Sequence, residues 1–307
     1  MEKLHKPVML KESLDYLIND LSGTYFDATL GYGGHSEEIL KRINKNGILV
    51  STDVDLDAFN YSIDKFKNEK RIKLYNFNFT QIDIISKIES IDFYDGILAD
   101  LGVSSFQLDN VEKGFTYRQE AKLDLRMDRN KVVNASDVIN SFSEDDLENI
   151  FSRFGEEKNS KKIAREICRY REKDRIKSTM ELSGIINRIT PKRYQAKTLS
   201  RVFQALRIFV NDELNNLESF LKKGVELLKR GGIIVVISYH SLEDRIVKEY
   251  FKYEALDCIC PKDFPVCQCD KESRLKILTR KPVAPTPREI EINNRARSAK
   301  LRAAERV

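Results

Sequence analysis

The sequence predicts an α/β protein with a doubly wound, mostly parallel sheet that is interrupted by a helical segment. Short apolar runs alternate with amphipathic helical patterns over roughly the first hundred residues, and the same rhythm returns in the last hundred. Between them no convincing buried strand is present and helical periodicity prevails. Such alternation is typical of parallel sheets with crossover helices. We therefore expect residues 1–108 and 200–307 to form the sheet domain and residues 109–199 a helical insertion.

Each element follows from a local pattern. Short apolar runs bounded by turn residues indicate buried strands, and apolar residues three or four positions apart indicate amphipathic helices. The predicted strands are Thr24–Leu30, Ile48–Ser51, Ile72–Asn76, Asp95–Leu101 and Ile233–Ser238. The predicted helices are Glu12–Leu21, Ser36–Ile43 with Ser36 as its cap, Leu56–Phe66, Ala135–Ile139, Asp145–Phe154, Ser160–Arg171, Met180–Arg188, Arg201–Val210 and Asp212–Leu228. The basic C-terminus is expected to end in a helix.

Size and charge bound the class of protein. The chain has 307 residues, 41% of them hydrophobic, which is enough for a substantial core. The formal net charge of +5 is compatible with a nucleic-acid partner without requiring one. The sequence has neither an apolar run of membrane-spanning length nor an apolar signal core, so we expect a cytoplasmic protein that does not bind membranes. Whether it forms a homodimer is left open.

The most informative motif is the segment Asp27–Ser36, DATLGYGGHS, which ends the first predicted strand and opens a helix. Small residues there let the backbone approach a ligand, and Asp53, at the end of the next strand, is placed to bind ribose hydroxyls. The glycines lack the G-x-G-x-x-G spacing of a dinucleotide site. An acid at Asp27 suits a ligand with a cationic end, such as the amino group of S-adenosylmethionine. A plain tight turn is the alternative interpretation.

Polar side chains also follow two later strands. Asp100 and Gln107 come after the fourth strand, and ligands of open α/β sheets bind at the carboxyl ends of strands, so we expect both to reach cofactor or substrate. Asp100 as the cap of the next turn is the alternative. His240 follows the last predicted strand and is a second candidate for a site at the same carboxyl ends of the strands. The simpler interpretation of this segment is a helix cap at Ser241. The adjacent Ser, His and Asp residues lack the spacing of a hydrolytic triad.

Four of the five cysteines form a C-x-C…C-x-C pattern, Cys258, Cys260, Cys267 and Cys269, in a loop that also contains prolines. Four thiolates in a reducing compartment can hold a structural Zn²⁺ ion. The spacing within each pair is tighter than usual for zinc, so free thiols remain the alternative. Cys168, on a predicted helix, is expected in the core.

Basic clusters around residues 118–129 and 295–302 are candidates for phosphate contacts, with solvated surface charge as the alternative. These clusters belong to a set of motifs that runs through nearly the whole chain in one order. The motifs are His5–Glu12, Asp27–Ser36, Asp100–Asp109, Gly114–Phe115, Leu123–Asp128, Gly155–Glu157, Phe203–Leu214, His240–Arg245 and Arg295–Arg302. On these residues the chain resembles the bacterial ribosomal RNA small subunit methyltransferase H family. It departs from the family pattern at Phe106, usually Pro, and at Lys197-Thr198, often His-Pro.

The resemblance implies an S-adenosylmethionine-dependent enzyme that methylates the exocyclic N4 of cytidine 1402 in the decoding region of 16S rRNA. It implies a Rossmann-like class I methyltransferase fold whose helical insertion recognises RNA. Asp100 is the first candidate for the catalytic proton acceptor and His240 the second. The implied cofactor contacts are Gly33, Gly34, His35, Asp53, Phe79, Asp100 and Gln107. A nicotinamide oxidoreductase and an RNA-binding assembly factor with a vestigial pocket are the rival functions.

Overall fold

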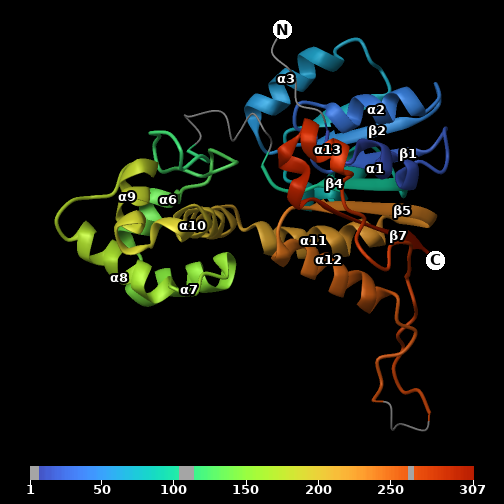
Figure 1. The fold of residues 1–307 in the computed structure, drawn as a ribbon. Coiled ribbons are helices and arrows are strands. Elements are labelled where there is room, and N and C mark those ends of the chain that lie inside the picture. Colours follow the sequence, from blue (N-terminus) through green and yellow to red (C-terminus); the bar gives the residue numbers. More distant parts are fainter. Residues whose placement is uncertain (1–6, 104–113, 262–265) are drawn as a thin grey trace. The chain divides into compact units, whose positions relative to one another are not determined.

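The computed structural model describes residues 7–103, 114–261 and 266–307 (Figure 1). The chain divides into two compact units. Met1–Gly102 and Leu214–Val307 form a sheet unit, and Val103–Glu213 form a helical unit. No helix in the described part of the chain is long and apolar enough to cross a membrane.

The sheet unit is built on seven strands in the order β3-β2-β1-β4-β5-β7-β6. They are β1 (Thr24–Asp27), β2 (Ile48–Thr52), β3 (Ile72–Tyr75), β4 (Tyr94–Asp100), β5 (Leu228–Ser238), β6 (Leu275–Ile277) and β7 (Lys300–Arg306). The neighbours from β3 to β5 pair in parallel, and β7 pairs antiparallel with both β5 and β6. The predicted doubly wound, mostly parallel sheet is confirmed, and its strand order reverses between β1 and β4.

Helices cover both faces of this sheet (Figure 1). Alternate strand residues point to opposite faces, so Phe26 packs with one set of helices and its neighbour Tyr25 with the other. One apolar cluster includes α4 (Ile82–Ile88), α11 (Glu213–Glu226) and α12 (Ser241–Glu254). The other includes α1 (Leu10–Leu17), α2 (Gly34–Arg42) and α3 (Leu56–Phe66). The short α13 (Pro287–Ile292) and the 3₁₀ turns η1 (Phe79–Gln81) and η4 (Asn294–Ser298) complete the unit.

The C-terminus corrects the prediction, because residues 300–306 form strand β7 instead of a helix. β7 lies between β5 and β6, and all four residues from Leu301 to Ala304 are buried. Polar and apolar residues therefore do not alternate along this strand. Its one arginine there, Arg302, is buried because Nε lies 2.7 Å from Oδ1 of Asp244 on α12. Arg302 therefore forms an internal ion pair with Asp244 and does not contact phosphate.

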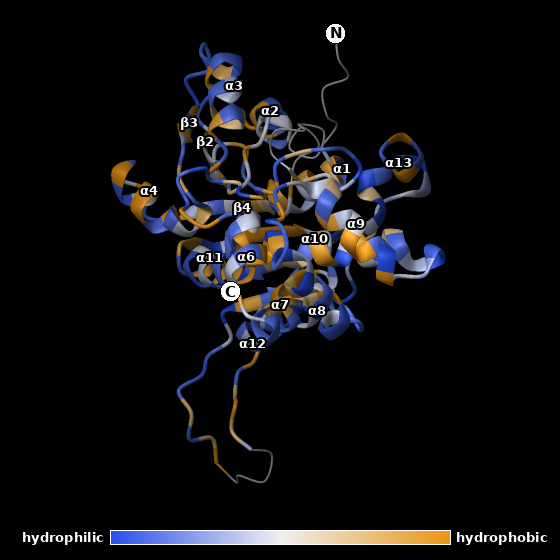
Figure 2. Ribbon diagram, turned by 90° about the vertical axis from the view of Figure 1, so that its left-hand side faces the viewer, coloured by the Kyte–Doolittle hydropathy of each residue, from blue (hydrophilic) through white to orange (hydrophobic). Residues whose placement is uncertain are grey.

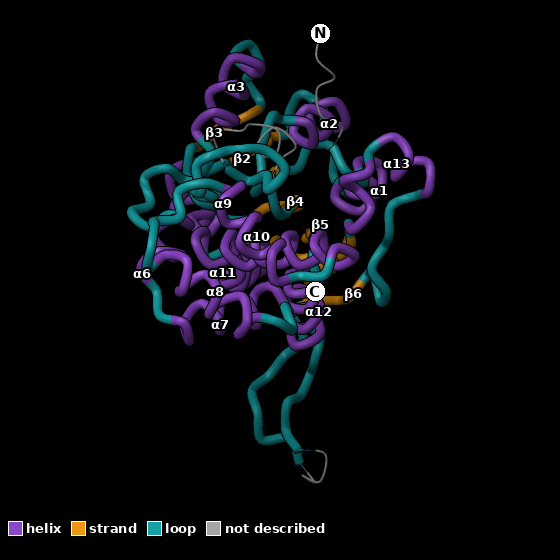
Figure 3. Tube along the Cα trace, turned by 60° about the vertical axis from the view of Figure 1, so that its left-hand side comes forward, coloured by secondary structure: helices purple, strands orange, loops and turns teal. Residues whose placement is uncertain are grey.

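The helical unit contains α6 (Ala135–Ser141), α7 (Glu144–Gly155), α8 (Ser160–Arg171), α9 (Thr179–Ile189), η3 (Lys192–Tyr194) and α10 (Gln195–Asn211) (Figure 3). Capping boxes begin three of these helices, at Asn134, Ser143 and Ser178. Hydrophobic and hydrophilic residues alternate along the helices, as expected when one face of each packs in a core (Figure 2). The unit reaches beyond residues 109–199 because α10 is one continuous helix whose buried apolar residues, from Leu199 to Val210, belong to its core.

Candidate active site

A tight glycine turn joins β1 to α2. Gly31 and Gly33 have φ of +50° and +71°, a left-handed conformation that favours glycine. A Cβ on Gly33 would lie 2.5 Å from Cε2 of Phe66, so a larger residue does not fit there. A Cβ on Gly31 would meet nothing closer than the Thr29 carbonyl oxygen at 4.0 Å, so this side of the turn is open. Gly34 is the first residue of α2, whose N-terminus has no side-chain cap and therefore offers backbone N–H groups to a ligand.

Asp53 holds the glycine turn from the end of β2. Its Oδ2 accepts a hydrogen bond from the Gly31 N–H at 2.7 Å, and its Oδ1 accepts one from the Asp55 N–H at 2.8 Å. Burial raises the pKa of this carboxyl to about 6, although the two N–H donors oppose the shift. Each carboxylate oxygen retains a further lone pair, so the group can still accept hydrogen bonds from a diol.

Asp27 does not face a ligand, contrary to the prediction. Its side chain is fully buried beneath the turn, where Oδ2 accepts the Ser36 hydroxyl at 2.7 Å and Oδ1 accepts the Thr29 N–H at 3.1 Å. The Ser36 hydroxyl also lies 2.9 Å from Oγ of Ser51. Ser36 therefore ties α2 to the sheet and is not the cap of the helix, which begins two residues earlier. Burial raises the pKa of Asp27.

Asp100, at the end of β4, lies between two side chains from distant parts of the chain. The Tyr239 hydroxyl donates to its Oδ1 at 2.7 Å, and Nδ1 of His35 lies 3.7 Å from its Oδ2. Nε2 of His35 lies 3.1 Å from the Val8 carbonyl oxygen, which can only accept, so Nε2 carries a proton. The Asp100 backbone N–H donates to Oγ1 of Thr29 at 2.7 Å. Asp100 is thus fixed from several sides by its neighbours.

The electrostatics of this group suit proton transfer. The side chain of Asp100 is 16% exposed, so part of the carboxylate is accessible. Burial raises its pKa to about 6, and His35 and the Tyr239 hydrogen bond offset this only in part. A carboxyl with a pKa near neutrality exchanges protons readily at physiological pH.

His240, the second catalytic candidate, is engaged in a helix cap. It is the N-cap of α12, with Nδ1 3.4 Å from the Glu243 N–H and Nε2 3.1 Å from Oε1 of Glu243. The second oxygen of Glu243 accepts the N–H groups of Tyr239 and His240. Ser241, the alternative candidate for the cap, is the first residue of the helix. In the structure, His240 therefore caps α12 and contacts Glu243.

Of the two remaining predicted cofactor contacts, Phe79 lies in the described part of the chain and Gln107 does not. Phe79 is the first residue of η1, after β3, and its ring packs edge-on against Phe220 of α11 with centroids 5.1 Å apart. Gln107 and the departure at Phe106 lie outside the described residues. Thr29 and Val8 lie in two of the sequence motifs, but the motifs did not predict their contacts with Asp100 and His35, because these contacts join segments that are distant in the sequence.

The basic motifs contain both internally paired and exposed residues: Arg118, Arg129, Arg295 and Arg297 are exposed, whereas Arg126 and Arg302 pair with acids. Arg126 pairs with Asp124 at 2.7 Å and donates to the carbonyls of Arg129 and Lys131. Arg207 on α10 is partly buried and pairs with Glu213 at 2.8 Å. These contacts stabilise the fold locally.

The four loop cysteines come together, with their Sγ atoms all within 4.8 Å of one another. Cys168 lies apart from them in sequence and is half-buried against the core of the helical unit, as predicted. The loop connects α12 to β6 within the sheet unit.

Comparison with known proteins gives full-length matches. Residues 2–307 match the MraW methylase family. A ribosomal RNA small subunit methyltransferase H from Caldicellulosiruptor saccharolyticus is 49% identical over 304 residues, covering 99% of both chains. Proteins of the same name from Halothermothrix orenii and Carboxydothermus hydrogenoformans are also 49% identical, over 306 and 311 residues. The first covers 99% of this chain and 98% of the relative, and the second covers 100% and 99%.

Proposed function

The chain belongs to the MraW methylase family, and from this premise we propose that it transfers a methyl group from S-adenosylmethionine to the exocyclic N4 of cytidine 1402 in 16S rRNA. The observation that carries the proposal is the end-to-end match to small-subunit rRNA methyltransferases. The glycine turn, Asp53 and Asp100 at neighbouring strand ends support it, because this edge of an open α/β sheet is where such folds bind nucleosides.

The residues present fit the cofactor. The open side of the turn at Gly31 and the uncapped N-terminus of α2 leave backbone N–H groups for its polar atoms. The spare lone pairs of Asp53 suit the ribose diol. When bound, S-adenosylmethionine supplies an electrophilic methyl group. The residues proposed to hold it are Gly33, Gly34, His35, Asp53, Phe79, Asp100 and Gln107.

Asp100 is proposed to complete the transfer. The N4 lone pair of cytosine is delocalised into the ring, so the enzyme must align the amino group and remove its proton as the new N–C bond forms and the S–C bond breaks. The partly exposed carboxylate of Asp100 receives that proton. The target base has to leave its stack to reach this site. The Tyr239 hydroxyl orients the Asp100 carboxylate.

The helical unit is proposed to bind the RNA. The exposed side of α8 carries basic residues that a phosphate backbone attracts, although two of them also pair with acids of the same unit. These residues are Lys161, Lys162, Arg165 and Arg169.

Mass spectrometry of 16S rRNA from cells with and without this protein tests the proposal directly. We expect one cytidine in the decoding region to lose a methyl group in its absence. Calorimetry with S-adenosylmethionine and with NADH separates a methyltransferase from an oxidoreductase that uses the same kind of sheet. An assembly factor with a vestigial pocket would bind small-subunit particles but transfer no labelled methyl group to them.

The pH profile is expected to have an acidic limb near pH 6. Asp100 accepts a proton only when ionised, and its pKa is raised to about 6, so turnover rises as pH increases through about 6 and then levels off. Asp53 has a similar pKa, but its protonation weakens cofactor binding. Turnover measured at saturating S-adenosylmethionine therefore isolates Asp100, and the limb should vanish from the residual rate of Asp100→Asn. A limb that persists in that variant would assign it to another group.

Tyr239→Phe is expected to move the acidic limb to higher pH. The hydroxyl donates to the ionised carboxylate of Asp100 and lowers its pKa, so its loss leaves the carboxyl protonated over a wider range. The Michaelis constant for S-adenosylmethionine should change little. Tyr253→Phe, at an exposed position on α12, is the matched control. A limb at the same pH in Tyr239→Phe and wild type would show that the hydroxyl does not tune Asp100.

A further inference from the structure

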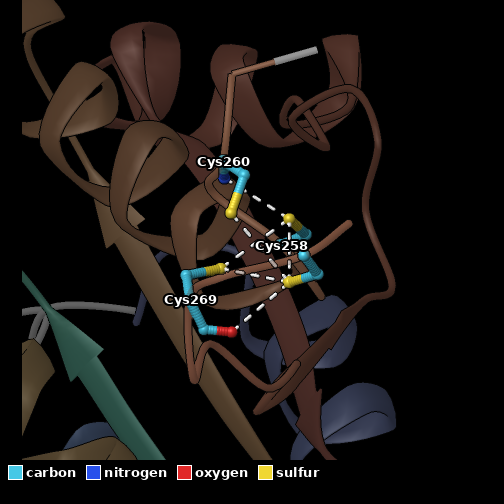
Figure 4. Close-up of side chains that lie close together, drawn as sticks. Cys258, Cys260 and Cys269 are labelled. Atoms are coloured by element: carbon cyan, nitrogen blue, oxygen red, sulfur yellow. Dashed lines mark hydrogen bonds between the residues drawn. The ribbon is translucent and has the colours of Figure 1, made fainter. Parts of the chain in front are cut away.

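The four cysteine sulfurs of the α12–β6 loop already have the spacing of a tetrahedral metal site. The Sγ atoms of Cys258 and Cys267 are 3.4 Å apart, those of Cys260 and Cys267 4.0 Å, and Cys269 lies 3.7 Å from both Cys258 and Cys267. A tetrahedron with metal–sulfur bonds of about 2.3 Å has edges of about 3.8 Å. Figure 4 shows the side chains converging from the two arms of the loop.

Backbone N–H groups support the sulfurs in a reciprocal pattern. The residue inside the first C-x-C pair, Ile259, donates to Sγ of Cys269 at 3.3 Å. The residue inside the second pair, Gln268, donates to Sγ of Cys260 at 3.2 Å. The backbone between the cysteines of each C-x-C pair thus donates to the second cysteine of the other pair. Such donors stabilise thiolates and are the usual outer partners of metal-bound ligands. The single-residue spacing, which argued against zinc, is what places these two amides.

The base of the loop is fixed independently of the cysteines. Glu254 ends α12 with its side chain only 4% exposed, and both of its oxygens accept hydrogen bonds from Arg274, at 2.6 and 2.7 Å. Nζ of Lys271 lies 3.6 Å from the same carboxylate. The two arms therefore leave the sheet unit side by side, and the cysteines lie further along them (Figure 1).

We propose that Cys258, Cys260, Cys267 and Cys269 bind one structural Zn²⁺ ion that cross-links the arms of this loop. Four sulfur ligands at tetrahedral spacing select zinc or iron among common metals, and zinc needs no redox partner. Four protein ligands leave no open position for chemistry. The segment 257–274 has four acids and three bases, and a zinc–tetrathiolate adds two negative charges. The zinc-bound loop is therefore negatively charged and would repel the phosphate backbone of RNA, so we assign it a structural role and not RNA binding.

Elemental analysis of the full-length protein, purified without chelators from zinc-supplemented cells, tests the site. We expect one zinc per chain. Cys258→Ser combined with Cys267→Ser removes one ligand from each pair and should abolish stoichiometric zinc. Cys168→Ser in α8 is the matched control and should retain it. Circular dichroism establishes that each variant is folded, and limited proteolysis should cut the 258–269 segment faster in the double variant than in wild type.

Three results would overturn the proposal. The first is wild-type protein whose four cysteines titrate as free thiols and which takes up no zinc on incubation. The second is a loss of mass that corresponds to disulfides among these cysteines. The third is stoichiometric iron with its visible absorption. The readout does not involve methyl transfer, so failure of the proposed enzymatic function would leave the zinc result standing.

Discussion

Replacing Asp100 with asparagine is expected to lower the turnover number for methyl transfer about 10²- to 10⁴-fold, the usual contribution of a positioned proton acceptor. Asparagine has the same shape and its Oδ1 still accepts the Tyr239 hydroxyl, so the site keeps its geometry and loses only its basicity. Affinity for RNA should change little. Single-turnover transfer from labelled S-adenosylmethionine to small-subunit particles measures the effect.

Asp95→Asn provides the matched control for Asp100. Asp95 lies near the other end of β4, where it accepts the Thr24 N–H at 2.8 Å and pairs with Lys229 at 2.8 Å. The same chemical change there is expected to affect stability alone. Turnover of Asp100→Asn close to that of Asp95→Asn would remove Asp100 from the mechanism and direct attention to water as the proton acceptor.

Gly33→Ala is expected to abolish measurable cofactor binding and to destabilise the sheet unit. A non-glycine residue at φ +71° costs about 1–3 kcal/mol, and the added Cβ also has to displace the buried ring of Phe66 from 2.5 Å. Both changes distort the turn that Asp53 holds. Calorimetric titration with S-adenosylmethionine and denaturant unfolding measure the two effects.

Gly184→Ala separates the glycine turn from a general effect of alanine. Gly184 lies within α9, and a Cβ there would meet nothing within 4 Å. Alanine is therefore expected to stabilise that helix by up to about 1 kcal/mol. If Gly33→Ala bound the cofactor as well as Gly184→Ala does, the backbone conformation of the turn would not be required for binding.

Much of the sheet unit was predictable because its signals are local. The apolar runs that form β2, β3 and β4 are short, and Gly47 and Asp53 directly flank β2, so the sequence pattern placed these strands within a few residues. The ends of parallel strands meet at one edge, and this alone predicted that Asp53 and Asp100 lie near the glycine turn. The C-terminal strand was missed because its buried residues do not alternate and its arginine is neutralised by Asp244.

The sequence by itself determined the class of fold, the position of the glycine turn and the family of the chain, because these depend on residues that are neighbours or follow a regular spacing. Only the tertiary structure decided what each polar group does. In the structure Asp27 is buried, Asp100 accepts a hydrogen bond from Tyr239, which lies 139 positions away in the sequence, and His240 caps a helix. The tertiary structure also brought four cysteines to tetrahedral spacing. Hydrogen-bond partners and burial set the charge and reactivity of a side chain, and both depend on contacts between distant segments that no local pattern encodes.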